Sequence, residues 1–145
     1  MRFLGLDVGS RRIGLAISDE TGTIAQPLKF IEAGTSYDRA IGEIENLCGQ
    51  YNVQGIVVGL PLSLSGGDRG ESAAAAKKVG GLLAKRLGIS VEYWDERFTT
   101  TEAERVLVDA RVRRTDRRAA VDKIAAALIL QGYLDAKSYK EEDAY

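Results

Sequence analysis

The segment that most constrains the fold is residues 55–60, which read GIVVGL. This unbroken apolar run is rich in β-branched residues, a pattern typical of a strand that is buried on both faces. Such a strand needs a covering layer on each side of its sheet, and helices usually supply those layers. A chain of 145 residues is long enough to bury a core of this kind in one domain. We therefore predict an α/β domain.

The rest of the apolar pattern fills in the sheet and its helices. Three earlier strands with short turns between them form an expected antiparallel meander, at 2–8, 12–19 and 23–33. A fifth strand is expected at 89–94. Helical spacing predicts helices at about 37–50, 72–87, 99–110 and 118–136. The prediction is a mixed five-stranded sheet, with three antiparallel strands and two parallel ones, flanked by helices.

The domain is expected to span 1–136, with a charged and flexible tail at 137–145. The first residues carry a charge early and lack the long apolar stretch of a signal peptide or a membrane span, so a cytoplasmic location with no membrane contact is the default. The single cysteine, Cys48, falls in a predicted helix and is expected to be a small core residue rather than a reactive thiol.

The chain contains no histidine, and this narrows the possible chemistry sharply. A Ser-His-Asp triad, a Cys-His pair and the usual zinc sites are all excluded. Any catalysis must use carboxylates, lysine, hydroxyl groups or metals bound through oxygen. Oxygen ligands suit Mg²⁺ or Mn²⁺.

Asp7 ends the first predicted strand and is followed by a glycine turn, in the stretch DVGSRRIG. An aspartate at such a place is often a simple turn residue. By strand alternation, however, Asp7 lies on the same face as Gly5, and a glycine there leaves room for a ligand beside the carboxylate. A turn role and a functional role remain about equally favoured at this point.

Two further segments carry acidic candidates for the same site. Asp95 and Glu96 follow the strand at 89–94 and would point to opposite faces if the strand continued. Asp122 begins an apolar helical stripe, where an uncompensated carboxylate would cost several kcal/mol unless it pairs or binds a cation. A salt bridge to Arg118, or a carboxylate that reaches solvent at the edge of the helix, is the alternative for Asp122.

If these carboxylates cluster, they repel one another. At about 4 Å and an effective dielectric constant of about 20, each like-charge contact costs about 4 kcal/mol. Divalent cations remove this cost and make such a cluster a two-metal site for phosphodiester cleavage. The predicted metal ligands and catalytic residues are Asp7, Glu96 and Asp122, with Asp95 as the second choice beside Glu96.

Basic residues near these acids are candidates for phosphate contact. The alternative for residues 111–118 is a solvated charged loop with no binding role. The net charge of −1 does not exclude a local basic face on the protein. The predicted nucleic-acid-binding residues are Arg11, Arg12, Arg69, Arg97, Arg111, Arg113, Arg114, Arg117 and Arg118.

The chain resembles the YqgF/RuvX family in four segments, which read LGLDVGSRRIGLAISD, IVVGLPLSLSGG, YWDERFTTTEAE and VDKIAAALILQGYL. The resemblance covers roughly residues 2–135. It implies an RNase H-like fold related to the RuvC Holliday-junction resolvase, and a bacterial cytoplasmic nuclease. The family is named for Holliday-junction resolution and is associated with maturation of the 5′ end of pre-16S rRNA.

Carried over by position, the family's acids match Asp7 in the first strand, Glu96 in the DER motif and Asp122 in the last helix. RuvC-like resolvases place an acid at the end of the fourth strand, where this chain has Gly59, Leu60 and Pro61. This departure weakens the transfer of junction specificity. The expected function is a Mg²⁺- or Mn²⁺-dependent endonuclease for pre-rRNA, with branched DNA as the alternative substrate.

Two other classes of function fit part of the pattern. A sugar-kinase-type ATPase also has Asp-x-Gly after its first strand, but such proteins need two domains of this kind. A non-catalytic RNA-binding module for ribosome assembly would need no metal and would bind RNA in a salt-sensitive way. Ribosomal particles are therefore possible partners, and either a monomer or a homodimer fits, since a two-fold dimer would suit a symmetric junction.

Overall fold

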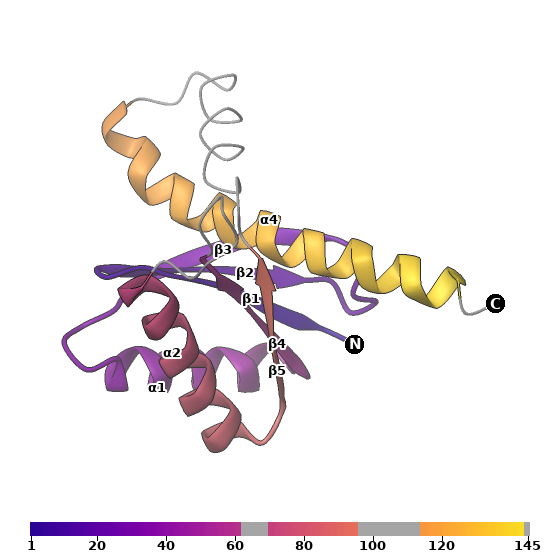
Figure 1. Cartoon of the computed structure of the whole chain (residues 1–145), viewed down its shortest axis with the longest axis horizontal. Helices are drawn as coiled ribbons and strands as arrows, with labels where there is room; N and C mark the ends of the chain where they lie inside the picture. Colours follow the sequence, from indigo (N-terminus) through magenta and orange to yellow (C-terminus); the bar gives the residue numbers. More distant parts are fainter. Residues whose placement is uncertain (62–69, 96–113, 144–145) are drawn as a thin grey trace.

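The computed structural model describes residues 1–61, 70–95 and 114–143, and describes the side chains of the last helix from 124 to 138. The elements follow the expected order of three strands, then alternating helices and strands (Figure 1). They are β1 (Phe3–Val8), β2 (Arg12–Ser18), β3 (Ala25–Glu32), α1 (Asp38–Tyr51), β4 (Gly55–Leu60), α2 (Glu71–Leu87), β5 (Ser90–Asp95) and α4 (Arg114–Asp143).

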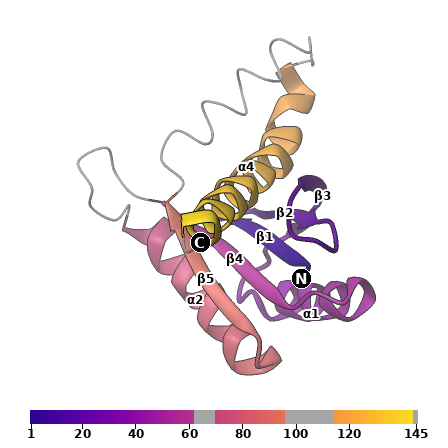
Figure 2. The same cartoon turned by 90° about the vertical axis from the view of Figure 1, so that its right-hand side faces the viewer.

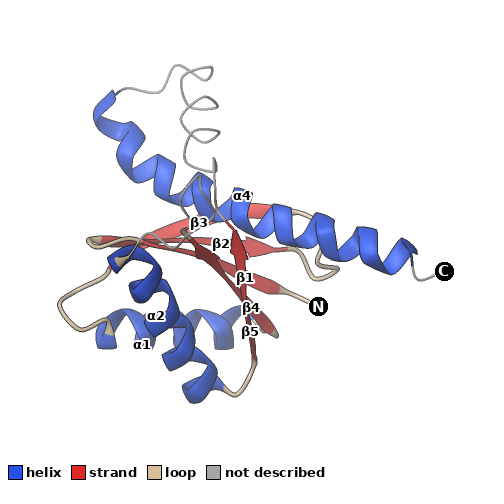
Figure 3. Cartoon of the chain, in the orientation of Figure 1, coloured by secondary structure: helices blue, strands red, loops and turns tan. Residues whose placement is uncertain are grey.

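The five strands form one sheet in the order β3-β2-β1-β4-β5. The first three strands pair antiparallel, whereas β4 runs parallel to both β1 and β5. Helices α1 and α2 cover one face of the sheet, and α4 crosses the other face (Figures 2 and 3). The predicted mixed sheet, with its meander and two parallel strands, is confirmed.

Strand β4 confirms the expectation drawn from GIVVGL. Ile56 and Val58 belong to the core beneath α1 and α2, and Val57 belongs to the core beneath α4. All three side chains are at most 1% exposed. The strand is therefore buried on both faces, as its unbroken apolar run predicts.

Strand β1 alternates in the same way. Leu4 and Leu6 pack with the core of α1 and α2, while Phe3 packs with α4. The turn after β1 is tight, because the Gly9 N–H donates to the Arg12 carbonyl oxygen at 2.9 Å. A Cβ on Gly9 would lie 2.7 Å from that same oxygen, so the turn requires glycine.

Cys48 is buried on the inner side of α1, as expected. Burial, aided by the charge of Glu45, raises the pKa of its thiol to about 11. A thiol with this pKa stays protonated at neutral pH, which fits a core residue and not a nucleophile.

The last helix is longer than its sequence suggests, and the expected boundaries at 118 and 136 are wrong. Helix α4 begins at Arg114, inside the segment expected to be a loop, and continues to Asp143, inside the expected tail. Arginine, lysine and glutamate are good helix formers, and Asp116 suits the first turn of a helix. A run of charges is therefore compatible with helix as well as with loop.

The helix expected at about 99–110 lies outside the described residues. Across the part of the chain that is described, none of the helices has the length and apolar character needed to cross a bilayer.

Candidate active site

Asp7 lies one residue before the end of β1 and is half-buried. It shares its face of the strand with Phe3 and Gly5, which face α4, and it pairs across the sheet with Gly14 of β2. The structure thus confirms the predicted position of Asp7 near the carboxyl end of a central strand. The carboxylate lies on the α4 side of the sheet.

Gly5 has a different role from the one expected. A Cβ at this position would lie 2.8 Å from the Cβ of Leu130 and 3.1 Å from the carbonyl oxygen of Ala126. Helix α4 therefore fills the space above Gly5. The expectation that this glycine leaves room for a ligand is wrong. The glycine allows α4 to approach β1 closely, two residues before Asp7.

Helix α4 runs antiparallel to β1. The ring of Tyr133 meets the ring of Phe3 edge-on at 5.6 Å between centroids, whereas Leu130 and Ala126 lie at Gly5. Moving toward the carboxyl end of β1 therefore means moving toward the amino end of α4. Asp122 lies on α4 four residues before Ala126, and its side chain lies outside the described set.

Strand β5 ends at Asp95, one residue later than predicted. Trp94 faces α4, since its Nε1 lies 2.8 Å from where a Cβ of Gly132 would be and its ring meets that of Tyr133 at 6.2 Å. Tyr93 faces α2, and its hydroxyl donates to the Lys77 carbonyl oxygen at 3.3 Å. Glu96 follows Asp95 directly and lies outside the described residues.

A cluster of three aromatic side chains, which the sequence pattern did not predict, packs on the α4 side of the sheet. Phe3, Trp94 and Tyr133 pack together beside Glu92 of β5. Burial, and then the hydrogen bond and the negative charge of Glu92, raise the pKa of Tyr133 to about 12. The available signal was the helical spacing of Tyr133 from Ala126 and Ile129, but the partners come from two distant strands.

Two of the predicted phosphate-binding arginines are described in full. Arg11 is exposed in the turn after β1, and Arg12 begins β2 half-buried, with its guanidinium 5.4 Å from the centre of the Phe30 ring. Arg12 shares the α4 side of β2 with Gly14, the partner of Asp7. Both arginines thus lie at the edge of the sheet where β1 ends.

The other predicted arginines are not described to the same extent. Arg114, Arg117 and Arg118 lie in the first two turns of α4, and their side chains fall outside the described set. The remaining ones lie outside the described residues altogether, namely Arg69, Arg97, Arg111 and Arg113.

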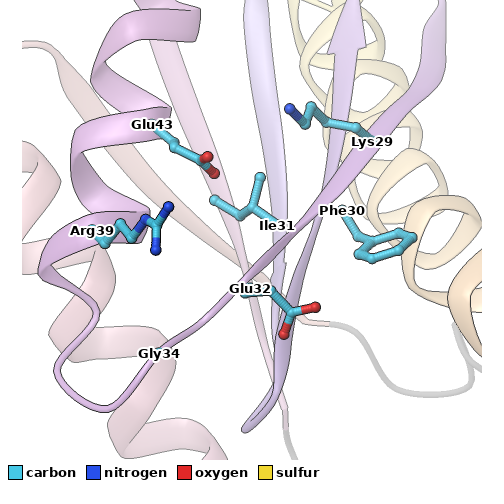
Figure 4. Close-up of a pocket in the computed structure, with 7 residues that line it drawn as sticks. All are labelled: Lys29, Phe30, Ile31, Glu32, Gly34, Arg39 and Glu43. Carbon is cyan, nitrogen blue, oxygen red and sulfur yellow. The ribbon is translucent and has the colours of Figure 1, made fainter.

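The described residues alone bring no three acidic, cysteine or histidine side chains together as a metal site. Of the predicted ligands, only the Asp7 side chain falls within them, with Asp95 as the second choice. A pocket of about 350 Å³ lies between the edge strand β3 and α1 (Figure 4). Its lining mixes Lys29 and Arg39 with Glu32 and Glu43. Glu32 pairs across the sheet with Arg12, so the pocket lies on the far side of β2 from Asp7.

Comparison with known proteins agrees with this fold. A family model described as "RuvX: Holliday junction resolvase" matches residues 1–136. A protein of Lactococcus lactis subsp. cremoris named "Putative pre-16S rRNA nuclease" is 45% identical over 144 residues, covering 96% of this chain and 97% of its own. A protein of Pelotomaculum thermopropionicum with the same name is 43% identical over 144 residues, covering 99% of this chain and 93% of its own.

Among solved structures, RuvC of T. thermophilus in complex with a Holliday junction substrate is similar, with a TM-score of 0.59 and 15% identity. The similarity covers 95% of this chain and 96% of RuvC. The fowlpox virus Holliday junction resolvase has a TM-score of 0.57 and 14% identity, over 94% of this chain and 99% of its own. These structures establish a RuvC-type, RNase H-like fold. The family model and the relatives at 43–45% identity show that the chain belongs to the RuvX family.

Proposed function

We propose that this protein is a divalent-metal-dependent endonuclease that hydrolyses phosphodiester bonds in structured nucleic acid, with Asp7, Glu96 and Asp122 at its catalytic centre. The observation that carries the proposal is the register between β1 and α4. Membership in the RuvX family favours a nuclease over the ATPase alternative.

The register leads from Asp7 to Asp122. Two residues of a strand advance about 6.6 Å, and four residues of a helix advance about 6 Å. The strand steps from Phe3 to Gly5 while the helix steps from Tyr133 and Leu130 toward Ala126. One more step of each kind reaches Asp7 on β1 and position 122 on α4. We therefore expect the two aspartates at the same level along the sheet.

The register within the sheet leads from Asp7 to Glu96. Leu6 pairs with Val58, so the next step pairs Asp7 with Gly59, and Gly59 pairs with Trp94. Trp94 faces α4, as Asp7 does. If strand alternation continued past Asp95, Glu96 would take the same face as Trp94, whereas Asp95 takes the side of Tyr93 and α2. This favours Glu96 over Asp95 as the third ligand.

The donor set of this centre suits Mg²⁺ or Mn²⁺, because three carboxylates offer only oxygen ligands. The half-burial of Asp7 also fits, since a cation would offset the cost of holding several carboxylates together. When bound, a metal pair of this kind activates water and stabilises the leaving oxygen. Arg11 and Arg12, at the same end of the sheet, would hold the phosphates on either side of the scissile bond.

For the substrate, we propose the 5′ end of pre-16S rRNA, either free or within a ribosomal particle. The names of the relatives at 43–45% identity support this choice. The end of β4 also supports it, because Gly59 and Leu60 stand where RuvC-like resolvases place an acid. Branched DNA is the second candidate, favoured by the description of the family model.

Cleavage by paired variants tests the proposed centre. Asp7→Asn should lower the cleavage rate of precursor rRNA at least about 100-fold, since loss of even a supporting residue of a metal site costs 10- to 100-fold. Asp95→Asn, its matched control, should keep most of the activity because alternation directs Asp95 away from Asp7. A four-way DNA junction assayed in parallel distinguishes the two substrates. Undiminished cleavage by Asp7→Asn would refute the proposed chemistry.

The role at the rRNA 5′ end needs a test in cells. Depletion of the protein should leave 16S rRNA with extended 5′ ends, as measured by sequencing those ends. Wild type should restore mature ends, whereas Asp122→Asn should not. Mature ends in depleted cells would count against pre-16S rRNA as the substrate, and full rescue by Asp122→Asn would count against catalysis.

A further inference from the structure

The two helices on the face opposite α4 differ in charge. Helix α1 carries three acidic residues and one arginine, whereas α2 carries four basic residues and a single acid, Glu71. Arg86 of α2 pairs with Glu45 of α1 at 3.2 Å between Nε and Oε2. The pairing neutralises Arg86 and leaves the excess positive charge of α2 on its lysines.

Two of these lysines lie on one exposed row of α2. The row consists of Ala74, Lys78, Gly81 and Lys85, at helical spacings of four, three and four, and all four residues are exposed. Within the described part of the chain, neither Lys78 nor Lys85 forms an ion pair. A Cβ at Gly81 would meet no atom within 4 Å, so the helix surface between the two lysines is open.

The spacing of the row matches a nucleic-acid strand. Seven residues of helix separate Lys78 from Lys85, about 10 Å along the axis. One strand of a duplex advances 3.4 Å per phosphate, so this distance spans roughly three phosphates.

Helix α2 also begins next to the proposed catalytic edge. It follows β4, whose carboxyl end lies beside that of β1, and it runs back along the sheet toward β5 (Figure 2). A strand that leaves the edge at Asp7 on the α2 side would therefore meet the positive row, while the side of α1 would repel it.

We propose that the row of Lys78 and Lys85 on α2 binds the phosphate backbone of the nucleic-acid substrate, outside the cleavage site. The identity of the polyanion as the substrate rests on the proposed function, while the binding surface rests on the charge and exposure of α2. The contact is to phosphates and not to bases, so it carries affinity without sequence preference.

The salt dependence of binding tests this surface. The probe is a fluorescein-labelled single-stranded RNA of about 20 nucleotides, measured by anisotropy in EDTA so that no cleavage occurs. Each phosphate contact to a single strand contributes about 0.7 to the slope of log K against log salt. The double variant Lys78→Ala/Lys85→Ala should reduce this slope by about 1.4, which weakens binding roughly 25-fold at about 0.1 M salt.

The matched control is Lys29→Ala/Arg39→Ala, which removes the same charge from exposed residues at the β3 and α1 side. It should leave the slope unchanged. Equal slopes for the two double variants would show an effect of net charge alone and would overturn the proposal, as would a wild-type slope for Lys78→Ala/Lys85→Ala. A wild-type dimer that the α2 variant splits, seen by light scattering, would assign the row to a second copy and also overturn it.

The failure of the proposed function would look different. Asp7→Asn should bind the probe with the wild-type slope and lack cleavage. Suppose that Asp7→Asn still cleaved, while Lys78→Ala/Lys85→Ala showed the reduced slope of log K against log salt. The catalytic assignment would then be wrong, and the proposed binding surface would be supported.

Discussion

Single glycines decide how closely α4 approaches the sheet. Leu130 of α4 leaves no room for a side chain at Gly5 of β1, and Trp94 of β5 leaves none at Gly132 of α4. Gly5 lies two residues before Asp7, and Trp94 lies two residues before Glu96. The residues that limit the position of α4 are thus close in sequence to two of the three proposed metal ligands.

Replacement of Gly132 by alanine should destabilise the protein. The new Cβ would lie 2.8 Å from Trp94 Nε1, and overpacking of this kind costs about 1–3 kcal/mol. The gain in helix propensity is only about 1 kcal/mol. Urea unfolding of Gly132→Ala should therefore give a free energy of unfolding up to about 2 kcal/mol below that of wild type. The emission of Trp94, the single tryptophan, should shift in the folded protein.

Gly49 of α1 offers the matched control, because a Cβ there would meet nothing within 4 Å. Gly49→Ala should raise the free energy of unfolding by about 0.5–1 kcal/mol and leave the Trp94 emission unchanged. If Gly132→Ala were stabilised to the same degree, the close contact with Trp94 would not limit the position of α4.

At the scale of an element, α1 buries its apolar side together with a thiol. Ala40, Ile41, Ile44 and Cys48 face the sheet, and the opposite side is polar. Because burial disfavours the thiolate, the pKa of Cys48 rises from an ordinary value of 9.0 to about 11. The packing of α1 against the sheet is therefore most favourable while the Cys48 thiol keeps its proton.

This gives a prediction for alkaline pH. The stability that comes from the neutral thiol is complete below pH 9 and is lost as the pH rises through about 11, since the unfolded chain releases the proton first. Cys48→Ala should lack this part of the decline. The difference in unfolding free energy between wild type and Cys48→Ala, measured by urea from pH 8 to 11, should shrink with pH. A constant difference would contradict the raised pKa. Tyr133, with a pKa of about 12, titrates in both proteins and cancels.

At the scale of the whole molecule, the sheet separates two cores that differ in how they are closed. Helices α1 and α2 close one core with two elements, whereas α4 is the one helix among the described residues that closes the other. Beyond Leu134, which is the last buried residue among the described side chains of α4, the helix still contributes a contact. The Lys137 ammonium lies 4.6 Å from the centre of the Phe3 ring. The segment expected to be a free tail thus begins with a residue that touches β1.

Truncation after Ala136 measures that contribution. Removal of residues 137–145 should lower the free energy of unfolding by about 0.5–1 kcal/mol, the size of an exposed cation–π contact. Lys137→Ala in the full chain should account for most of the loss. A truncated protein as stable as wild type would show that the domain ends at 136, as its sequence predicts.

Much of the fold could be read from periodicity. GIVVGL predicted a strand buried on both faces, and β4 is one, with its bounds at Gly55 and Leu60 as expected. The limits of α4 could not be read in this way, because charged residues with good helix propensity suit an exposed helix and a loop equally. The site was predictable in part, since strand alternation alone put Asp7 on the same face as Gly5.

The sequence by itself determined the order of the described elements, the face on which Asp7 lies and the restriction to oxygen ligands, because these follow from local spacing and from the absence of histidine. Only the tertiary structure decided what fills the space beside Gly5 and which way α4 crosses β1. Both depend on contacts between residues more than 100 positions apart, such as Gly5 with Leu130. Periodicity shows which face of an element is apolar, but the element that covers this face, and at what register, is set by side-chain packing across the whole domain.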